Sequence, residues 1–171
     1  SKISGFDENF DNYNYLIIPG VGNFDNAISF LKKHNHFSKL TDKKFLENKK
    51  IFGICVGMQV LFESSEEGKS KGLSLIPGGV KKFNNSKLRV PHMGWNKVHG
   101  DDIDFNMSEK KFYFAHSYYV DCDDKYVKAY CNYTHKFPAY VKSNNIYGIQ
   151  FHPEKSSING IEFLKNLISG F

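Results

Sequence analysis

The sequence predicts an α/β protein in which a core of parallel strands is extended by antiparallel or mixed strands. In the first third of the chain, the apolar runs at residues 15–18 and 51–54 are each followed by a segment with helical spacing. This strand–helix–strand–helix order is typical of a parallel layer covered by helices. From residue 79 onward, short strand-like runs alternate with Gly and Asn turns, a texture that favours antiparallel or mixed pairing.

The first half of the chain is divided by apolar spacing and by turn residues. The elements expected there are a buried strand at residues 15–18, a glycine-rich loop at 19–22, helices at 23–33 and 39–48, a buried strand at 51–54, a helix at 56–62 and a polar loop at 64–72.

The second half contains short runs that suit strands, followed by one amphipathic helix. The strands expected there are residues 80–83, 87–90, 96–98, 112–120, 126–132, 139–141 and 146–151, and the closing helix is residues 160–169. Because no repeat, linker or low-complexity segment interrupts the pattern, we expect one domain over residues 1–171.

Composition excludes several classes of protein. A 171-residue chain that is 40% hydrophobic suits a globular domain, and no apolar run approaches membrane-spanning length. The net charge is +5, but its lysines are scattered and Arg89 is the only arginine, so we expect neither a nucleic-acid nor a membrane partner. Cys55, Cys122 and Cys131 are an odd count without metal-ligand spacing, which favours a reducing, cytoplasmic setting and no metal site.

Cys55 stands where a buried strand passes into a helix, between Gly53 and Gly57. This is the order of a nucleophile elbow, in which the nucleophile occupies a sharp, strained turn and its small neighbours let other backbone come close. The following helix is expected to point its N-terminus at the sulfur and to favour a thiolate. The alternative for this motif alone is a buried structural cysteine.

A thiol nucleophile needs a base, and His152 is a candidate near the end of the chain. In an extended segment, residues two apart project to the same side, so Glu154 is expected beside His152. The carboxylate would then fix the orientation and tautomer of the imidazole, as the third member of a triad does. On its own, this segment also suits an ordinary strand exit.

The loop at residues 19–22 follows a buried strand, as Cys55 does, so both are expected at one edge of the sheet, where α/β proteins bind ligands. An oxyanion needs two backbone N–H donors. Val56, after the nucleophile, is expected to supply one, and Val21 or Gly22 in the glycine-rich loop the other. The alternative is a plain strand-to-helix turn.

Two of these motifs, GICVGMQ and FHPEKS, resemble the signature pair of class I (triad-type) glutamine amidotransferases. From about residue 15 to the C-terminus, the runs PGVGNF, LFESSEEG, KGLSLIPGGV, VPHMGWN, YFAHSYYV and QFHPEKS are similar to members that serve histidine biosynthesis. The resemblance implies the family's three-layer fold and hydrolysis of L-glutamine to glutamate and ammonia without a metal or organic cofactor. It also implies a heterodimer with a (β/α)₈ cyclase subunit, which uses the ammonia to make imidazole glycerol phosphate.

The resemblance also implies roles for individual residues. Cys55 would be the nucleophile, His152 the general base and acid, and Glu154 the orienting carboxylate, with the amides of Val56, Val21 and Gly22 as the oxyanion hole. The residues that would bind glutamine are Gly20, Gln59, Glu67, His116, Ser117 and Tyr118. Those that would face the cyclase are Trp95, Tyr113 and Lys155.

The sequence departs from the family pattern at its start. The family opens with a strand and helix of about 30 residues, which we expect this sequence to lack. Three explanations are open for this strand and helix. The unit was left out of the sequence, another segment supplies it, or the sequence belongs to a defective product. Three other functions remain open: an amidotransferase serving a sugar-modifying synthase, a stand-alone cysteine hydrolase, and a non-catalytic docking subunit.

Overall fold

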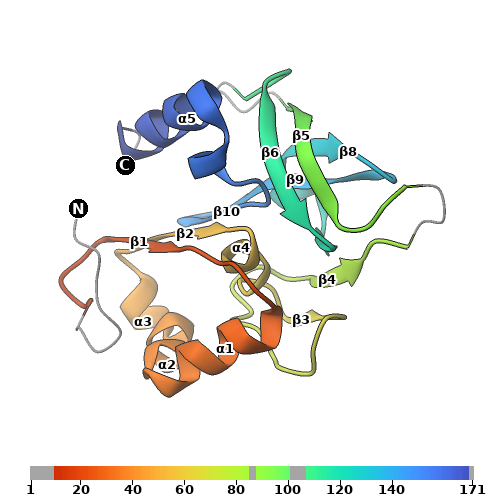
Figure 1. Cartoon of the computed structure of the whole chain (residues 1–171). Coiled ribbons are helices and arrows are strands. Elements are labelled where there is room, and N and C mark those ends of the chain that lie inside the picture. The colour runs from red at the N-terminus through yellow and green to blue at the C-terminus, as the bar shows by residue number, and fades with distance from the viewer. Residues whose placement is uncertain (1–9, 85–87, 101–106, 170–171) are drawn as a thin grey trace.

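The computed structural model describes residues 10–84, 88–100 and 107–169 (Figure 1). Within these residues, one sheet has the strand order β1-β2-β10-β9-β8-β5-β6 and a smaller sheet has the order β3-β4-β7. The strands are β1 (Tyr15–Ile18), β2 (Lys50–Ile54), β3 (Ser64–Ser65), β4 (Gly79–Lys82), β5 (His92–His99), β6 (Lys111–His116), β7 (Tyr118–Asp121), β8 (Val127–Asn132), β9 (Lys136–Ser143) and β10 (Ile146–Ile149).

Helices cover both faces of the strands β2 and β10 (Figure 1). They are α1 (Phe24–Lys33), α2 (His36–Thr41), α3 (Lys43–Leu46), α4 (Val56–Gln59) and α5 (Ser157–Ser169), with 3-10 turns η1 (Asp124–Tyr126) and η2 (Pro153–Lys155). Strand β2 alternates between the two sides: Ile51 belongs to the core beneath α1 and α2, and Phe52 to the core that includes Phe163 of α5. This alternation explains why β2 is apolar throughout and produces three layers.

Strand pairing confirms a parallel core with an antiparallel extension. Strand β2 pairs in parallel with β1 and with β10, so that Ile51 lies opposite Leu16 on one side and Ile146 on the other. Antiparallel pairs continue the sheet from β10 through β9, β8 and β5 to β6. None of the helices among the described residues combines the length and apolar character that crossing a membrane requires.

Two predicted helices are shorter in the structure. The helix expected at residues 39–48 is divided at Asp42, whose side chain caps α3 by accepting from the N–H of Lys44 at 2.9 Å. The helix expected at residues 56–62 is the single turn α4. It ends because the carbonyls of Val60 and Leu61 accept instead from the N–H groups of Leu73 and Leu75, which belong to a distant segment.

The predicted strands also need corrections. Residues 112–120 form two strands in different sheets, because β6 pairs with β5 whereas β7 pairs with β4, and the chain passes between them at Ser117. The polar loop at 64–72 contains the short strand β3. Of the strand expected at 87–90, Lys87 lies outside the described residues and 88–90 form no strand. The remaining strands and the closing helix are present with shifted ends.

Strand β1 was expected to be buried, but it is half exposed. Among the described strands it pairs only with β2 and therefore forms one edge of the large sheet. Tyr15 and Ile17 retain 48% and 52% of their exposure, whereas β2 is enclosed between β1 and β10. The apolar sequence of β1 alone does not distinguish an edge strand from an enclosed one.

Candidate active site

Cys55 occupies the sharp turn that the motif predicts. It follows β2 directly and precedes α4, and its backbone has φ 54° and ψ −112°, a conformation that non-glycine residues rarely adopt. The side chain is buried. The strained backbone presents the sulfur at the carboxyl edge of the parallel strands β1 and β2, where ligands bind in folds of this class.

Glycines allow the loop after β1 to pack directly against this turn. A Cβ atom on Gly57 would lie 1.8 Å from the carbonyl oxygen of Ile18, and one on Gly53 would lie 2.3 Å from the carbonyl oxygen of Gly57. A Cβ atom on Gly20 would lie 2.4 Å from the nitrogen of Gly57. Gly20, which is predicted to bind glutamine, packs the glycine-rich loop against the turn that carries Cys55.

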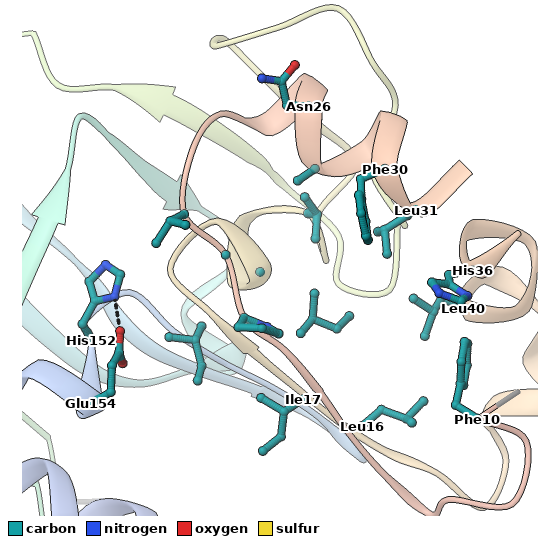
Figure 2. Close-up of a pocket in the computed structure, with 18 residues that line it drawn as sticks. Phe10, Leu16, Ile17, Asn26, Phe30, Leu31, His36, Leu40, His152 and Glu154 are labelled. Carbon is teal, nitrogen blue, oxygen red and sulfur yellow. Dashed lines mark hydrogen bonds and ion pairs between the residues drawn. The ribbon is translucent and has the colours of Figure 1, made fainter. Parts of the chain in front are cut away.

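His152 and Glu154 are hydrogen-bonded, as predicted, although by a different local geometry. The Nδ1–H of His152 donates to Oε1 of Glu154 at 2.8 Å (Figure 2). The two residues are not part of one extended segment, because the 3-10 turn η2 begins at Pro153 and brings the carboxylate back beside the ring. Since Nδ1 is the donor, the Nε2 atom of His152 is left as the nitrogen that can accept a proton. The imidazole is buried, whereas Glu154 is half exposed.

A small cavity of about 250 Å³ brings most of the predicted site residues together. Its lining comprises Val21, Gly22, Cys55, Val56, Gln59, Glu67, Ala115, His116, Ser117, Tyr118, His152 and Lys155. These residues come from the loops after β1 and β3, from Cys55 and α4 after β2, from β6, β7 and the residue between them, and from the segment after β10. A nucleophile, a base and several polar groups therefore surround one space, which is small enough for a single amino acid.

A second cavity, of about 930 Å³, lies between β1 and the helices α1 and α2 (Figure 2). Its walls are mainly apolar, with Phe10, Leu16 and Phe30 among the lining residues. It reaches His152 and Glu154 but does not include Cys55. An apolar groove does not suit a polar substrate such as glutamine, and this groove lacks the nucleophile Cys55 that would attack the substrate. We therefore place the reaction in the smaller cavity.

The Cys55 thiol is protonated at neutral pH, contrary to the expectation from the motif. Burial raises its pKa to about 11, and the charges of Glu154 and Glu67 act in the same direction. The N–H of Val56 and the side chain of Gln150 oppose this rise without overcoming it. The one-turn helix α4 is too short to provide the strong dipole that the sequence suggested. The thiol donates weakly to the carbonyl of Ala115, at 4.0 Å.

Other predicted residues lie around the cavity with defined partners. The side-chain Nε2 of Gln59 donates to the carbonyl of Tyr118 at 3.0 Å and to Oε1 of Gln150 at 3.1 Å, so both its hydrogens are used and Oε1 is left for a ligand. The Oε2 atom of Glu67 accepts from the N–H of Phe24 at the start of α1, at 2.8 Å. Val21, in the proposed oxyanion loop, is 84% exposed.

The three residues predicted to face a partner are adjacent on the surface. The rings of Trp95 and Tyr113 meet edge to face with centroids 6.2 Å apart, and the Nζ atom of Lys155 lies 5.9 Å from the centroid of Tyr113. Trp95 is 50% exposed, so it does not belong to the core. The N–H of His152 donates to the carbonyl of Tyr113 at 2.8 Å, which connects this patch with His152.

Sequence reasoning missed Gln150, which lies at the sulfur, and His92, which contacts His116 of the small cavity. Gln150 is fully buried, and its Nε2 atom lies 3.7 Å from the Sγ atom of Cys55. His92 is buried against His116, with its Nδ1 atom 3.0 Å from the Nε2 atom of that residue. The available signal for Gln150 was an amide within the otherwise apolar run at residues 146–151. Nothing in the sequence pattern pairs His92 with His116.

Two of the buried histidines, His92 and His116, should make the protein sensitive to acid. Burial lowers the pKa of His92 to about 4 and that of His116 to about 3. The unfolded chain binds protons below about pH 6.5 while the folded chain does not, so stability is complete above this pH and falls as the pH drops towards the folded pKa values. Between pH 7 and pH 5 we expect a loss of about 2 kcal/mol per histidine.

Urea titrations at the two pH values measure this loss. Ordinary carboxylates remain mostly ionised above pH 5 in either state, so the window reports mainly on histidines. The variant His135→Gln, which changes an exposed histidine, should show the same fall in the free energy of unfolding. Equal stability at pH 7 and pH 5 would show that His92 and His116 are not held neutral by burial.

Comparison with known proteins identifies the family of this chain. Residues 2–169 match the family model described as glutamine amidotransferase class-I. The chain is 41% identical over 172 residues to imidazole glycerol phosphate synthase subunit HisH 2 of Vibrio vulnificus, covering 97% of this chain and 80% of that protein. It is 45% identical over 157 residues to the HisH subunit of the same synthase from Carboxydothermus hydrogenoformans, covering 89% and 78%.

Solved structures show the same fold. A crystal structure of a glutamine amidotransferase superposes with a TM-score of 0.69 at 15% identity, covering 92% of this chain and 80% of that one. The crystal structure of a glutamine amidotransferase from Thermotoga maritima gives 0.61 at 16% identity, covering 96% of this chain and 64% of that one. With the family model matching nearly the whole sequence, the chain belongs to the class I glutamine amidotransferases.

Proposed function

We propose that this chain hydrolyses L-glutamine to glutamate and ammonia, with Cys55, His152 and Glu154 as its triad. The observation that carries the proposal is the small cavity, which places the strained Cys55 and the Glu154-oriented His152 around one space. The relatives named as HisH subunits of imidazole glycerol phosphate synthase support a role in histidine biosynthesis. The reducing setting that a free nucleophilic thiol requires favours the cytoplasm.

The reaction proceeds in two halves. His152 takes the thiol proton as the Cys55 sulfur attacks the side-chain amide carbon of glutamine, and the N–H of Val56 with the Val21–Gly22 loop stabilises the oxyanion. Collapse of this intermediate breaks the C–N bond; His152 returns the proton to the leaving nitrogen, and ammonia departs from a γ-glutamyl thioester. Water, deprotonated by His152, then cleaves the thioester, which releases glutamate and restores the thiol.

Ammonia that escapes into water becomes protonated and ceases to be a nucleophile, so it passes directly to a (β/α)₈ cyclase subunit that makes imidazole glycerol phosphate. The cyclase docks on the patch formed by Trp95, Tyr113 and Lys155, which is exposed and lies beside His152. Docking there can reach the triad through the backbone, because Lys155 follows Glu154 and the carbonyl of Tyr113 accepts from His152.

The isolated chain should be a weak glutaminase that its partner stimulates strongly. Burial raises the pKa of the Cys55 thiol to about 11, which disfavours the thiolate in the isolated chain at pH 7. We expect stimulation of at least about a hundredfold when the cyclase is loaded with its acceptor substrate. The loaded cyclase would favour a site in which the second oxyanion donor is in place and the Cys55 thiolate forms. The measurement is glutamate production with and without the loaded cyclase.

Replacement of Lys155 by alanine should reduce this stimulation by more than it lowers the basal rate, since Lys155 also lines the small cavity. Lys136→Ala is a matched control, because Lys136 also lies over a tyrosine ring, that of Tyr130, but on another part of the surface. A full rate in the isolated chain would reject gating by a partner and favour a stand-alone cysteine hydrolase. No glutamate with or without the cyclase would favour a non-catalytic docking role.

A further inference from the structure

A continuous series of hydrogen bonds connects the Cys55 sulfur with strand β5 through side chains that the proposed mechanism does not use. We propose that Gln150 is a further catalytic residue that donates a hydrogen bond to the Cys55 thiolate, and that His116 and His92 are positioning residues that fix its orientation. This inference rests on the proposed function and assigns a donor to its nucleophile.

The donor lies directly at the reacting atom. Gln150 follows β10, is fully buried, and is held by its own N–H, which donates to the carbonyl of Ala139 at 3.0 Å. Its Nε2 atom is 3.7 Å from the Sγ atom of Cys55, a distance that suits a hydrogen bond to sulfur. A thiolate at this place would have two donors, the Gln150 amide and the N–H of Val56, and both favour its formation.

The orientation of Gln150 follows from a single backbone carbonyl. The oxygen of Tyr118 can only accept, so Gln59 must turn its NH₂ group towards it, at 3.0 Å. The second hydrogen of that group then points at Gln150, 3.1 Å away, which must present its oxygen. The NH₂ group of Gln150 is thereby turned towards the sulfur. The reverse orientation would place two NH₂ groups face to face.

His116 fixes the same carbonyl from its other side. Its Nδ1 atom lies 2.7 Å from the oxygen of Tyr118 and must therefore carry the hydrogen, so its Nε2 atom accepts from Nδ1–H of His92 at 3.0 Å. The Nε2 atom of His92 in turn accepts from the amide of Asn96 on β5, at 3.3 Å. Each ring thus has one allowed tautomer.

Charge is excluded from this part of the network. Burial keeps both histidines neutral at physiological pH, as their lowered pKa values indicate. Protonation of His116 would set two N–H groups against each other at the His92–His116 contact, and protonation of His92 would do the same at its contact with the Asn96 amide. The carbonyl of Tyr118 is therefore held by two donors, Gln59 and His116, and this arrangement specifies which atom of Gln150 faces Cys55.

The ionisation of Cys55 provides a direct test, measured as the pH dependence of its alkylation by iodoacetamide with detection by mass spectrometry. Several groups face the sulfur from the surrounding elements, namely His152, Glu154, Glu67, His116 and Lys155, and all of them stay in the test variants of Gln150. In Gln150→Met, which has similar length but no N–H donor, the alkylation midpoint should rise by about one pH unit. In Gln150→Glu, which places a carboxyl group there, the rise should be larger.

Steady-state kinetics in the complex with the cyclase give the second readout. Gln150→Met should lower kcat about tenfold or more and change KM less than about threefold, because the lost hydrogen bond acts on the thiolate rather than on bound glutamine. Loss of packing alone would let water reach the sulfur and lower the alkylation midpoint rather than raise it, because burial is the main cause of the raised pKa of Cys55. Circular dichroism melting confirms that each variant is folded.

The positioning role is tested at His116 with a matched pair. Asparagine can place its Nδ2–H where the histidine has Nδ1–H, so His116→Asn should keep the alkylation midpoint and most of kcat. His116→Leu lacks that donor and should shift both in the direction of Gln150→Met. If Gln150→Met and Gln150→Glu fail to fold, this pair of His116 variants still tests whether the hydrogen-bond network around Gln150 favours the Cys55 thiolate.

The outcomes separate this inference from the proposed function. If the unaltered chain hydrolyses glutamine but the variants of Gln150 keep its alkylation midpoint and kcat, the assignment of Gln150 is overturned and the triad stands. If His116→Leu behaves as the unaltered chain while Gln150→Met is impaired, the positioning role of His116 is overturned. If the unaltered chain hydrolyses no glutamine in the complex, the proposed function itself fails.

Discussion

Replacement of Cys55 by alanine should abolish glutaminase activity, with a loss of at least about a thousandfold, while the fold remains intact. Alanine keeps the Cβ atom and therefore the same backbone strain at φ 54°, so the variant removes the sulfur and little else. Cys55→Ser should be nearly as inactive, because a serine hydroxyl ionises far less readily than a thiol. Glutamate release in the presence of the loaded cyclase measures both.

Labelling identifies the nucleophile independently. A glutamine-like electrophile should modify Cys55 and leave Cys122 and Cys131 unmodified, because burial raises the pKa of each of these thiols to about 12 and neither lines the small cavity. Cys122→Ala is the matched control and should retain full activity. Labelling at Cys122 or Cys131 with Cys55 unmodified would contradict the assignment of the nucleophile.

Replacement of Gly57 by alanine should damage both the fold and the site. The added Cβ atom would lie 1.8 Å from the carbonyl oxygen of Ile18, which belongs to paired backbone and cannot move without displacing β1 and the oxyanion loop after it. We expect a loss of about 3 kcal/mol, which for a chain of this size lowers Tm by roughly 6–12 °C. Thermal melting and glutamate release measure the two effects.

The matched control for this variant is Gly79→Ala in β4. The nearest atom to a Cβ at Gly79 is the Oγ atom of Ser64 at 3.4 Å, which is ordinary contact, so this change should alter Tm by only a few degrees. Equal effects of the two substitutions would show that the cost at Gly57 is a general cost of losing a glycine. A stable Gly57→Ala variant with full activity would show that the loop does not pack against the turn as described.

The chemistry of the site was predictable because its signals are local. Cys55 between two glycines at a strand–helix junction predicts a strained turn, and the structure shows the positive φ that such a turn requires. His152 and Glu154 are only two residues apart, so their pairing needs one turn of backbone and little else. The parallel order of β1 and β2 also follows from the sequence, since each strand leads into a helix.

Properties that depend on distant segments were not predictable in this way. The sequence predicts a thiolate at Cys55, but burial by surrounding elements raises the pKa of the thiol. The short length of α4 depends on residues 72–76, whose N–H groups bond the carbonyls of the residues that follow the helix. The division of residues 112–120 depends on partners in two sheets. Gln150, His116 and His92 are far apart in sequence, so their network exists only once the chain has folded.

The sequence by itself therefore determined the strained turn at Cys55, the pairing of His152 with Glu154 and the parallel core, because each is encoded by neighbouring residues. Tertiary structure alone decided the protonation of Cys55, the orientation of the Gln150 amide and the contact of Trp95 with Tyr113 and Lys155. The physical reason is that desolvation and hydrogen-bond direction depend on every group packed around an atom, and those groups come from elements that the chain order does not place together.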